Sequence, residues 1–213
     1  MSSAPLPEAT PVAVFAKAPQ PGAVKTRLAG TLGAQGASAL HAQLVVRSVE
    51  TALAAGLGPV TLWCAPDPSD PFFASLAARH GVALRRQEGH DLGARMEAAF
   101  RDAFARSTPL LVIGADCPAL EPVDLRDAAF ALERHDAVIA PAEDGGYVLV
   151  GLARAQPIFD GMPWGGPQVL ARTRERLRDA GASWHELRML WDVDRPEDLA
   201  RLQQSGLLEG ATR

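Results

Sequence analysis

The apolar positions of the chain fall into short continuous runs separated by longer stretches with helical spacing. A short apolar run bounded by turn residues predicts a buried strand. Such runs cover residues 12–16, 60–64, 82–84, 110–113, 137–140, 147–150 and 185–190. Between them, helical spacing predicts helices at about residues 36–55, 72–80, 91–106, 121 onward, 168–179 and 196–204. This alternation predicts an α/β fold with a mainly parallel sheet and helices over its faces.

The strand at residues 147–150 is expected to break the parallel pattern. It follows the strand at 137–140 through an Asp-Gly-Gly turn, which is too short for the helical crossover that joins parallel strands. Gly145 and Gly146 can supply the positive φ of a hairpin turn. We therefore predict a mixed, mostly parallel sheet, and we expect ligands to lie beyond the carboxyl ends of its strands.

Composition places the chain among ordinary globular proteins. Its 213 residues are 47% apolar and 22% charged, which excludes intrinsic disorder and membrane classes. This length fits one domain over residues 1–213, with a flexible N-terminus at 1–10. The net charge of −4 has the wrong sign for a nucleic-acid binder. Two cysteines and no signal-peptide pattern favour a cytoplasmic protein without membrane insertion.

Three cations lie in or beside the turn-rich connection after the first strand. Lys17, Lys25 and Arg27 occur within residues 17–28 without a carboxylate between them, so the loop can surround an anion such as a phosphate. A solvated basic loop is the alternative interpretation. Lys25 and Thr26 do not form a P-loop, because that motif needs a glycine immediately before the lysine and Val24 stands there.

Carboxylates follow the central strand and precede the last helix. Asp116 stands in Gly-Ala-Asp-Cys-Pro, where it can bind a hard cation such as Mg²⁺ or cap the next turn. Asp192 and Asp194 project in the same direction if their segment is extended, so that one of them could face Asp116. Asp194 and Glu197 also have the spacing of a helix capping box. Cys117 is expected to be a buried thiol, because no histidine partner accompanies it in the sequence.

Two further segments carry polar groups that could contact a substrate. Glu143 and Asp144 open the Asp-Gly-Gly turn, and one of them could orient or deprotonate a substrate hydroxyl, although a turn needs no such function. Gln87 can pair with a base or sugar edge, and Arg95, in the first turn of its helix, could meet an anion.

The order of these segments resembles a known family. The chain carries Pro-Gly-x-x-Lys-Thr-Arg-Leu, Gly-Ala-Asp-Cys-Pro, Asp-Gly-Gly-Tyr and Asp-Val-Asp-x-Pro-Glu-Asp-Leu in that order. This order resembles a bacterial family of GT-A-fold transferases in the nucleotide-diphospho-sugar transferase superfamily, often described as glycosyltransferases. It is also similar to the small nucleotidyltransferases that make molybdopterin dinucleotides or activate 2-phospholactate with GTP. The resemblance covers about residues 12–202 and implies a three-layer α/β/α sandwich.

The resemblance also implies roles for the residues of each motif. It places Mg²⁺ or Mn²⁺ on Asp116 and Asp194, with Asp192 as a less certain partner. The residues expected to bind the nucleotide are Ala16, Lys17, Lys25, Arg27, Gln87 and Arg95. The residues expected to bind the acceptor are Gly145, Gly146, Tyr147 and Trp164. The residues expected to take part in catalysis are Lys25, Arg27, Glu143 and Asp144.

Three functions remain open from the sequence. The first is glycosyl transfer from a nucleotide-diphosphate sugar to a small acceptor, in which the metal neutralises the departing diphosphate. The second is nucleotidyl transfer, in which a phosphorylated small molecule attacks the α-phosphate of an NTP and pyrophosphate leaves. The third is a nucleotide-binding module without turnover, which the presence of both Asp116 and Asp194 disfavours.

Overall fold

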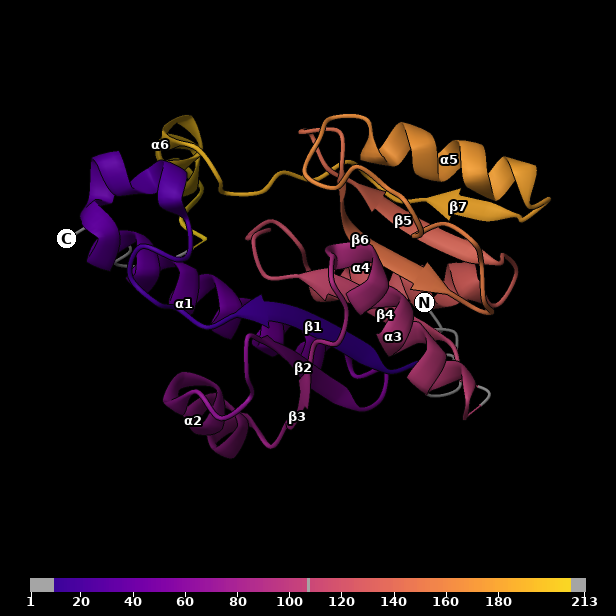
Figure 1. The fold of residues 1–213 in the computed structure, drawn as a ribbon, viewed down its shortest axis with the longest axis horizontal. Coiled ribbons are helices and arrows are strands. Elements are labelled where there is room, and N and C mark those ends of the chain that lie inside the picture. Colours follow the sequence, from indigo (N-terminus) through magenta and orange to yellow (C-terminus); the bar gives the residue numbers. More distant parts are fainter. Residues whose placement is uncertain (1–9, 107, 208–213) are drawn as a thin grey trace, which may run out of the picture.

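The described strands join one seven-stranded sheet in the order β3-β2-β1-β4-β6-β5-β7 (Figure 1). The structure is a computed structural model that describes residues 10–106 and 108–207. Residues 1–9 of the N-terminus expected to be flexible lie outside this part, and Thr10 is buried. The strands are β1 (Val12–Lys17), β2 (Val60–Ala65), β3 (Ala83–Arg86), β4 (Leu110–Gly114), β5 (Ala137–Pro141), β6 (Tyr147–Leu152) and β7 (Trp184–Glu186).

The strand directions confirm the predicted mixed sheet. Strand β6 runs antiparallel to both of its neighbours, β4 and β5, while the other pairings are parallel. Strands β1, β2, β4 and β5 therefore end at one edge of the sheet, and β6 begins there, with Pro141 paired to Tyr147. The connections that follow these ends carry most of the residues singled out in the sequence.

Helices cover both faces of the sheet. They are η1 (Thr26–Leu28), α1 (Ala29–Ala55), α2 (Pro71–His80), α3 (Leu92–Phe104), α4 (Pro122–Leu132), α5 (Val169–Asp179) and α6 (Pro196–Ser205). Alternate residues of β1 point to opposite faces: Val12 and Val14 pack with α1, α2 and α4, whereas Ala13 and Phe15 pack with α3 and α5. This confirms the three-layer α/β/α arrangement.

Helix α6 packs against the first part of α1 (Figure 1). Leu199 and Leu202 of α6 join Leu40 and Leu44 of α1 in a third apolar cluster. Trp191 lies in the same cluster, so the chain just before α6 is held close to α1. This packing brings the C-terminal segment to the edge of the sheet where β1 and β4 end.

Several element boundaries differ from those expected. Helix α1 (Ala29–Ala55) is interrupted at Gly33, whose φ of 70° and ψ of 166° are not helical, so a short helical segment precedes the main helix, which begins close to the predicted residue 36. Strand β7 ends at Glu186, and Leu190 forms only an isolated bridge to Ala142. Leu92 was expected on the apolar face of α3 but is 43% exposed.

Helix α6 begins with a capping box, but its residues are Arg195 and Asp198 rather than the predicted Asp194 and Glu197. The carboxylate of Asp198, not that of Glu197, accepts the backbone N–H groups of Asp194 and Arg195, at 2.9 and 2.7 Å. Asp198 is the third residue of α6, so it satisfies donors that precede the helix. The carboxylate of Asp194 is therefore not used for capping and remains available to the site.

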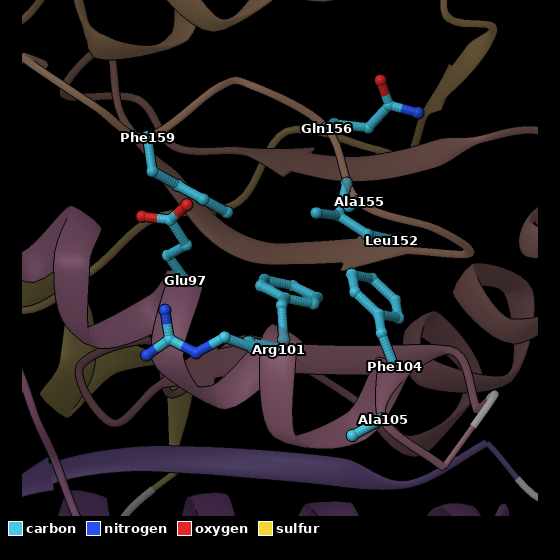
Figure 2. Close-up of a pocket in the computed structure, with 9 residues that line it drawn as sticks. Glu97, Arg101, Phe104, Ala105, Leu152, Ala155, Gln156 and Phe159 are labelled. Atoms are coloured by element: carbon cyan, nitrogen blue, oxygen red, sulfur yellow. The ribbon is translucent and has the colours of Figure 1, made fainter.

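The face covered by α3 and α5 is rich in aromatic side chains. Phe100 and Phe104 of α3 stack at 5.9 Å between ring centroids, and Phe100 stacks on Phe159 at 5.6 Å. A cavity opens beside these rings, between α3 and the loop that follows β6 (Figure 2).

Candidate active site

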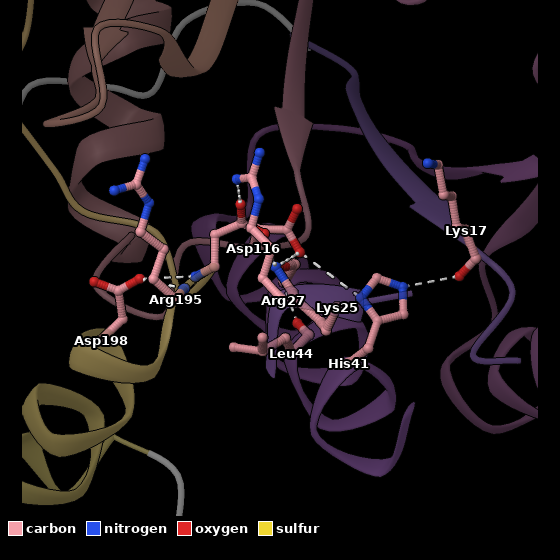
Figure 3. Close-up of polar contacts among 10 residues, drawn as sticks. Lys17, Lys25, Arg27, His41, Leu44, Asp116, Arg195 and Asp198 are labelled. Carbon is pink, nitrogen blue, oxygen red and sulfur yellow. Dashed lines mark hydrogen bonds and ion pairs between the residues drawn. The ribbon is translucent and has the colours of Figure 1, made fainter. Parts of the chain in front are cut away.

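Lys25 lies between two carboxylates at the end of the sheet (Figure 3). Its side chain is only 3% exposed, and its Nζ lies 2.6 Å from Oδ1 of Asp116 and 3.8 Å from Oδ1 of Asp194. The backbone of Lys25 has a φ of +47°, which is uncommon for a residue other than glycine. Arg27, two residues further on, pairs with the other oxygen of Asp194. The predicted cationic loop and the predicted metal-binding carboxylates are therefore in direct contact.

Asp116 presents two different oxygens. Oδ1 is buried against Lys25, while the side chain as a whole is 48% exposed, so the carboxylate also faces solvent. Burial opposes ionisation of Asp116, but Lys25 and His41 outweigh it and hold the pKa of this carboxyl well below its usual range. The backbone carbonyl of Asp116 accepts the N–H of Val193 at 2.9 Å, which fixes the segment 192–194 beside it.

His41 is a site residue that the sequence analysis missed. It is buried on α1, with Nε2 3.0 Å from the carbonyl oxygen of Lys17 and Nδ1 3.7 Å from Oδ1 of Asp116. A carbonyl oxygen only accepts hydrogen bonds, so Nε2 carries a hydrogen. The sequence signal was weak, because His41 lies among the apolar positions of a helix and could be taken for a core residue.

A cavity of about 320 Å³, here called the acidic cavity, opens at this edge of the sheet. The polar and aromatic residues that line it include Asp116, Asp144, Asp192, Asp194, Tyr147 and Trp164. Burial, together with the nearby Asp144, raises the pKa of Asp192 to about 6. The hydroxyl of Tyr147 and the indole nitrogen of Trp164 are buried and form no hydrogen bond of ordinary geometry with a described residue. The Tyr147 hydroxyl interacts instead with the side chain of Thr173 on α5, inside the protein.

A second cavity, of about 250 Å³, lies beyond the ends of β1 and β2 and is here called the basic cavity. Its charged lining residues are Lys17 and Arg95, and Gln20 and Pro66 also line it. Arg95 uses its Nε to donate to the carbonyl of Gly89 at 3.2 Å, so its terminal nitrogens remain available to a ligand. Among its lining residues there are no carboxylates, which makes this cavity complementary to an anion.

Gln87 and Ala16 are hydrogen-bonded to each other. The amide nitrogen of Gln87 donates to the carbonyl oxygens of Ala16 and Trp63, at 3.2 and 2.8 Å. Gln87 thus bridges the ends of β1 and β2, and the buried carbonyl of Ala16 is already bonded. The expected contact between this amide group and a nucleotide base or sugar stays a prediction, for which the side-chain oxygen of Gln87 remains available.

Glu143 and Asp144 differ in their surroundings. Arg201 of α6 donates two hydrogen bonds to the carboxylate of Glu143, at 2.7 and 3.0 Å, and these lower its pKa. Arg201 also lies over the ring of Trp191, 4.4 Å from its centroid. Glu143 does not line the acidic cavity, and its expected part in activating an acceptor stays a prediction. Asp144 does line that cavity.

The glycines of the turn have separate functions. Gly145 has a φ of +90°, and a Cβ there would lie 2.1 Å from the carbonyl oxygen of Pro167. Gly146 donates its N–H to the side chain of Asp144 at 2.8 Å and lines the acidic cavity. Gly145 is thus a packing residue, and Gly146 is the turn glycine that a ligand could approach.

Cys117 is buried, and its burial raises the pKa of the thiol to about 12, as expected of an unreactive cysteine.

Known proteins resemble this chain in sequence and in structure. Residues 48–166 match the family described as uncharacterized protein conserved in bacteria, DUF2064. The chain belongs to this family. The DUF2064 chain is 34% identical to the phosphoenolpyruvate guanylyltransferase of Rubrobacter xylanophilus over 187 residues. This alignment covers 85% of this chain and 88% of that protein.

Solved structures share the fold of the DUF2064 chain. A candidate nucleotide-diphospho-sugar transferase from Desulfovibrio desulfuricans G20 matches with a TM-score of 0.85 and 30% identity, over 95% of this chain and 90% of that one. Rv0371c from Mycobacterium tuberculosis H37Rv, in complex with manganese, matches with a TM-score of 0.52 and 19% identity, over 92% and 100% of the two chains. The expected family, the fold and the assignment as a transferase are thereby confirmed, and the interpretation as a module without turnover is set aside.

Proposed function

We propose that this transferase is a metal-dependent nucleotidyltransferase that joins an NTP to a phosphorylated small molecule and releases pyrophosphate. The main observation is the pairing of a basic cavity, at the ends of β1 and β2, with an acidic cavity that begins at Asp116. His41 links the two, since it contacts both Lys17 and Asp116. The guanylyltransferase relative supports nucleotidyl transfer over glycosyl transfer, and supports GTP as the first donor to test.

The carboxylates fit a divalent cation. Asp116 and Asp194 offer only oxygen atoms, which Mg²⁺ and Mn²⁺ prefer. The two carboxylates are close enough together for one cationic group, the Nζ of Lys25, to lie within 4 Å of both. Among the described residues no group of three or more His, Cys, Asp or Glu side chains could hold a metal alone. Two protein carboxylates, with phosphates and waters completing the coordination, are the usual arrangement for Mg²⁺ at phosphate-transfer sites. When bound there, the cation would neutralise charge that develops on the departing pyrophosphate.

The other residues of the site bind and orient the substrates. Lys17 and Arg95 would hold the NTP in the basic cavity, while Arg27, 62% exposed, can turn toward its phosphates. Tyr147 and Trp164 would form part of the wall against which the acceptor lies in the acidic cavity. Lys25 is too buried to follow a substrate; its role is to hold Asp116 and Asp194 together.

The proposed reaction needs no strong general base. An oxygen of the acceptor phosphate attacks the α-phosphorus of the NTP, the bond to the bridging oxygen of the β-phosphate breaks, and that oxygen leaves with pyrophosphate. Because the attacking phosphate is already an anion, no proton has to be removed. This agrees with the absence of a free acid at Glu143, whose carboxylate is bound by Arg201.

Glycosyl transfer from a nucleotide-diphosphate sugar is a second candidate. The structural match to a candidate nucleotide-diphospho-sugar transferase, at 30% identity over nearly the whole chain, favours it. In this case Asp144, which lines the acidic cavity together with Tyr147, would orient the acceptor hydroxyl. The two reactions differ in the donor bound and in the product released: pyrophosphate, or a nucleoside diphosphate.

A thermal-shift and product-release panel tests the proposal. The intact chain is incubated with each NTP or nucleotide sugar, with and without Mn²⁺, and phosphorylated acceptors including phosphoenolpyruvate are then added. We expect stabilisation by a single NTP with Mn²⁺ and release of pyrophosphate with a phosphorylated acceptor. Stabilisation by nucleotide sugars alone would instead establish glycosyl transfer.

Paired variants test the metal assignment. Asp116→Asn should abolish the Mn²⁺-dependent part of the stabilisation, because the amide is a weaker ligand for a hard cation. Asp127→Asn is the matched control, since Asp127 is exposed on α4 and lines none of the cavities described. An Asp116→Asn variant that binds Mn²⁺ and NTP as well as the parent would refute this role of Asp116.

A further inference from the structure

A third cavity lies apart from the acidic and basic cavities. It has a volume of about 400 Å³, within the range of about 300–1,000 Å³ typical of small-molecule sites, and lies between α3 and the loop after β6 (Figure 2). We call it the aromatic cavity. It is lined by Glu97, Phe100, Arg101, Phe104, Ala105, Leu152, Ala155, Gln156 and Phe159. None of these residues lines either of the other two cavities.

The inner wall of the aromatic cavity suits a flat, apolar ring. Phe100 and Phe159 stack with an interplanar angle of 16°, and Phe100 and Phe104 stack at 24°. Leu152 closes the wall from β6, and Ala155 faces it from the loop (Figure 2). Aromatic rings favour offset-stacked or edge-to-face contacts with one another, so a further ring can extend this array.

The rim carries one charge of each sign. Glu97 and Arg101 are separated by one helical turn on the exposed side of α3, and both line the cavity (Figure 2). Within the part of the chain that the structure describes, neither side chain forms a hydrogen bond or an ion pair. A head group with an ammonium and a carboxylate is complementary to this pair, since the ammonium can meet Glu97 and the carboxylate can meet Arg101.

We propose that the aromatic cavity binds a small zwitterionic aromatic molecule, with the chemistry of a free aromatic α-amino acid. The ring enters among Phe100, Phe104 and Phe159, and the head group stays at the rim between Glu97 and Arg101. This site is distinct from those for the nucleotide and the acceptor, and it does not depend on which group the enzyme transfers.

Phe159 connects the aromatic cavity to the acidic cavity. Its ring stacks both on Phe100 and on Trp164, at 5.6 and 6.4 Å between ring centroids. Trp164 meets Tyr147 edge-on, at 6.4 Å, and both line the acidic cavity. A ring bound against Phe159 therefore changes the surroundings of Trp164, and this coupling is part of the proposal.

Calorimetric titration of the intact chain with four matched probes tests the ligand class. Phenylalanine has the ring and both charges; 3-phenylpropionate lacks the ammonium, 2-phenylethylamine lacks the carboxylate, and alanine lacks the ring. We expect phenylalanine to bind about fivefold or more tightly than either single-charge analogue, and alanine to give no binding. No binding of phenylalanine at about 10 mM, or equal binding of the three ring compounds, would overturn the proposal.

Variants of the rim and wall locate the site. Arg101→Gln should remove the advantage of phenylalanine over 2-phenylethylamine, and Glu97→Gln its advantage over 3-phenylpropionate. Ala155→Trp should fill the cavity and abolish binding of all three; Ala155 is exposed, so the melting temperature should hold. Asp116→Asn should bind phenylalanine like the parent, which separates this site from the proposed active site. Phenylalanine binding that survives Ala155→Trp would place the ligand elsewhere.

The coupling has its own spectroscopic readout. In a ¹⁵N-labelled chain, saturation with phenylalanine should shift the indole N–H resonance of Trp164, identified by its loss in Trp164→Phe. The resonance of Trp184 is the internal control, because its indole N–H donates to Glu186 at 3.0 Å and Trp184 does not line the aromatic cavity. Binding that leaves the Trp164 resonance unmoved would overturn the coupling.

Discussion

Replacing Lys25 by methionine should destabilise the fold even without substrate. Methionine keeps most of the apolar stem but removes the ammonium that lies 2.6 Å from Asp116 and 3.8 Å from Asp194. Breaking a fully buried ion pair costs about 3–5 kcal/mol, whereas an exposed pair is worth about 0–1 kcal/mol. The Lys25 side chain is 3% exposed and that of Asp116 is 48% exposed, so we expect an intermediate loss of about 2 kcal/mol.

Urea denaturation at neutral pH measures this loss as a change in midpoint at constant slope. Two further variants complete a double-mutant cycle: Asp116→Asn and the combination with Lys25→Met. We expect the combined variant to lose less stability than the sum of the single variants, because the second change removes a charge already left without its partner. A divalent cation should restore part of the stability of Lys25→Met, since it binds the folded state between the same carboxylates.

Two results would refute this reasoning. A loss below about 0.5 kcal/mol in Lys25→Met would mean that the ion pair is solvated like a surface pair. Additivity of the two single changes to within about 0.3–0.5 kcal/mol would mean that Lys25 and Asp116 do not interact energetically.

Three other predictions concern separate parts of the fold. Arg174 donates two hydrogen bonds to Glu186 and lowers its pKa, so Glu186→Gln should cost about 0.5–1 kcal/mol at neutral pH. The stabilisation by the Arg174–Glu186 pair is present above the ordinary pKa of Glu186, 4.5, and is lost as the pH falls through the lower pKa of Glu186 in the folded protein. The urea midpoints of the parent and of Glu186→Gln should therefore become equal in acid. Gly145→Ala should cost more stability than Gly165→Ala, for which we expect a loss of roughly 1 kcal/mol. Both glycines have positive φ, but only at Gly145 would a Cβ meet a carbonyl oxygen, at 2.1 Å. Equal melting temperatures of the two variants would contradict this. Cys117 should resist a thiol reagent in the native protein and react in urea, and rapid native labelling would show that it is not buried.

The fold was predictable from the sequence because its five central strands, β1, β2, β4, β5 and β6, are buried on both faces. Continuous apolar runs such as 110–113 have few other interpretations, and the short Asp-Gly-Gly connection sufficed to predict an antiparallel β6. The carboxyl ends of parallel strands meet at one edge, so the position of Asp116 near the loop of Lys25 also followed. Boundaries were less predictable, since a short helical segment precedes the kink at Gly33, outside the periodic region.

The partners of the charged side chains could not be predicted in the same way. The contact between Arg27 and Asp194 joins residues 167 positions apart, and that between Glu143 and Arg201 joins residues 58 apart. Such pairs depend on how α6 packs against α1, which local spacing does not encode. The same applies to His41, whose contact with Asp116 requires α1 to cross the end of β4. Motif order located the site, but only packing decided which acids remain available in it.

Helix α3 is a wall of all three cavities. Leu92 lines the acidic cavity, Arg95 the basic cavity, and Glu97 and Phe100 the aromatic cavity. Successive residues of a helix are rotated by about 100°, so one short stretch can face three directions. The contact of α3 with the acceptor side is close, because a Cβ at Gly93 would lie 2.7 Å from both the carbonyl oxygen of Phe159 and the indole nitrogen of Trp164. A close-packed helix moves as a unit, so a ligand that displaces α3 at one cavity must change the shape of the other two.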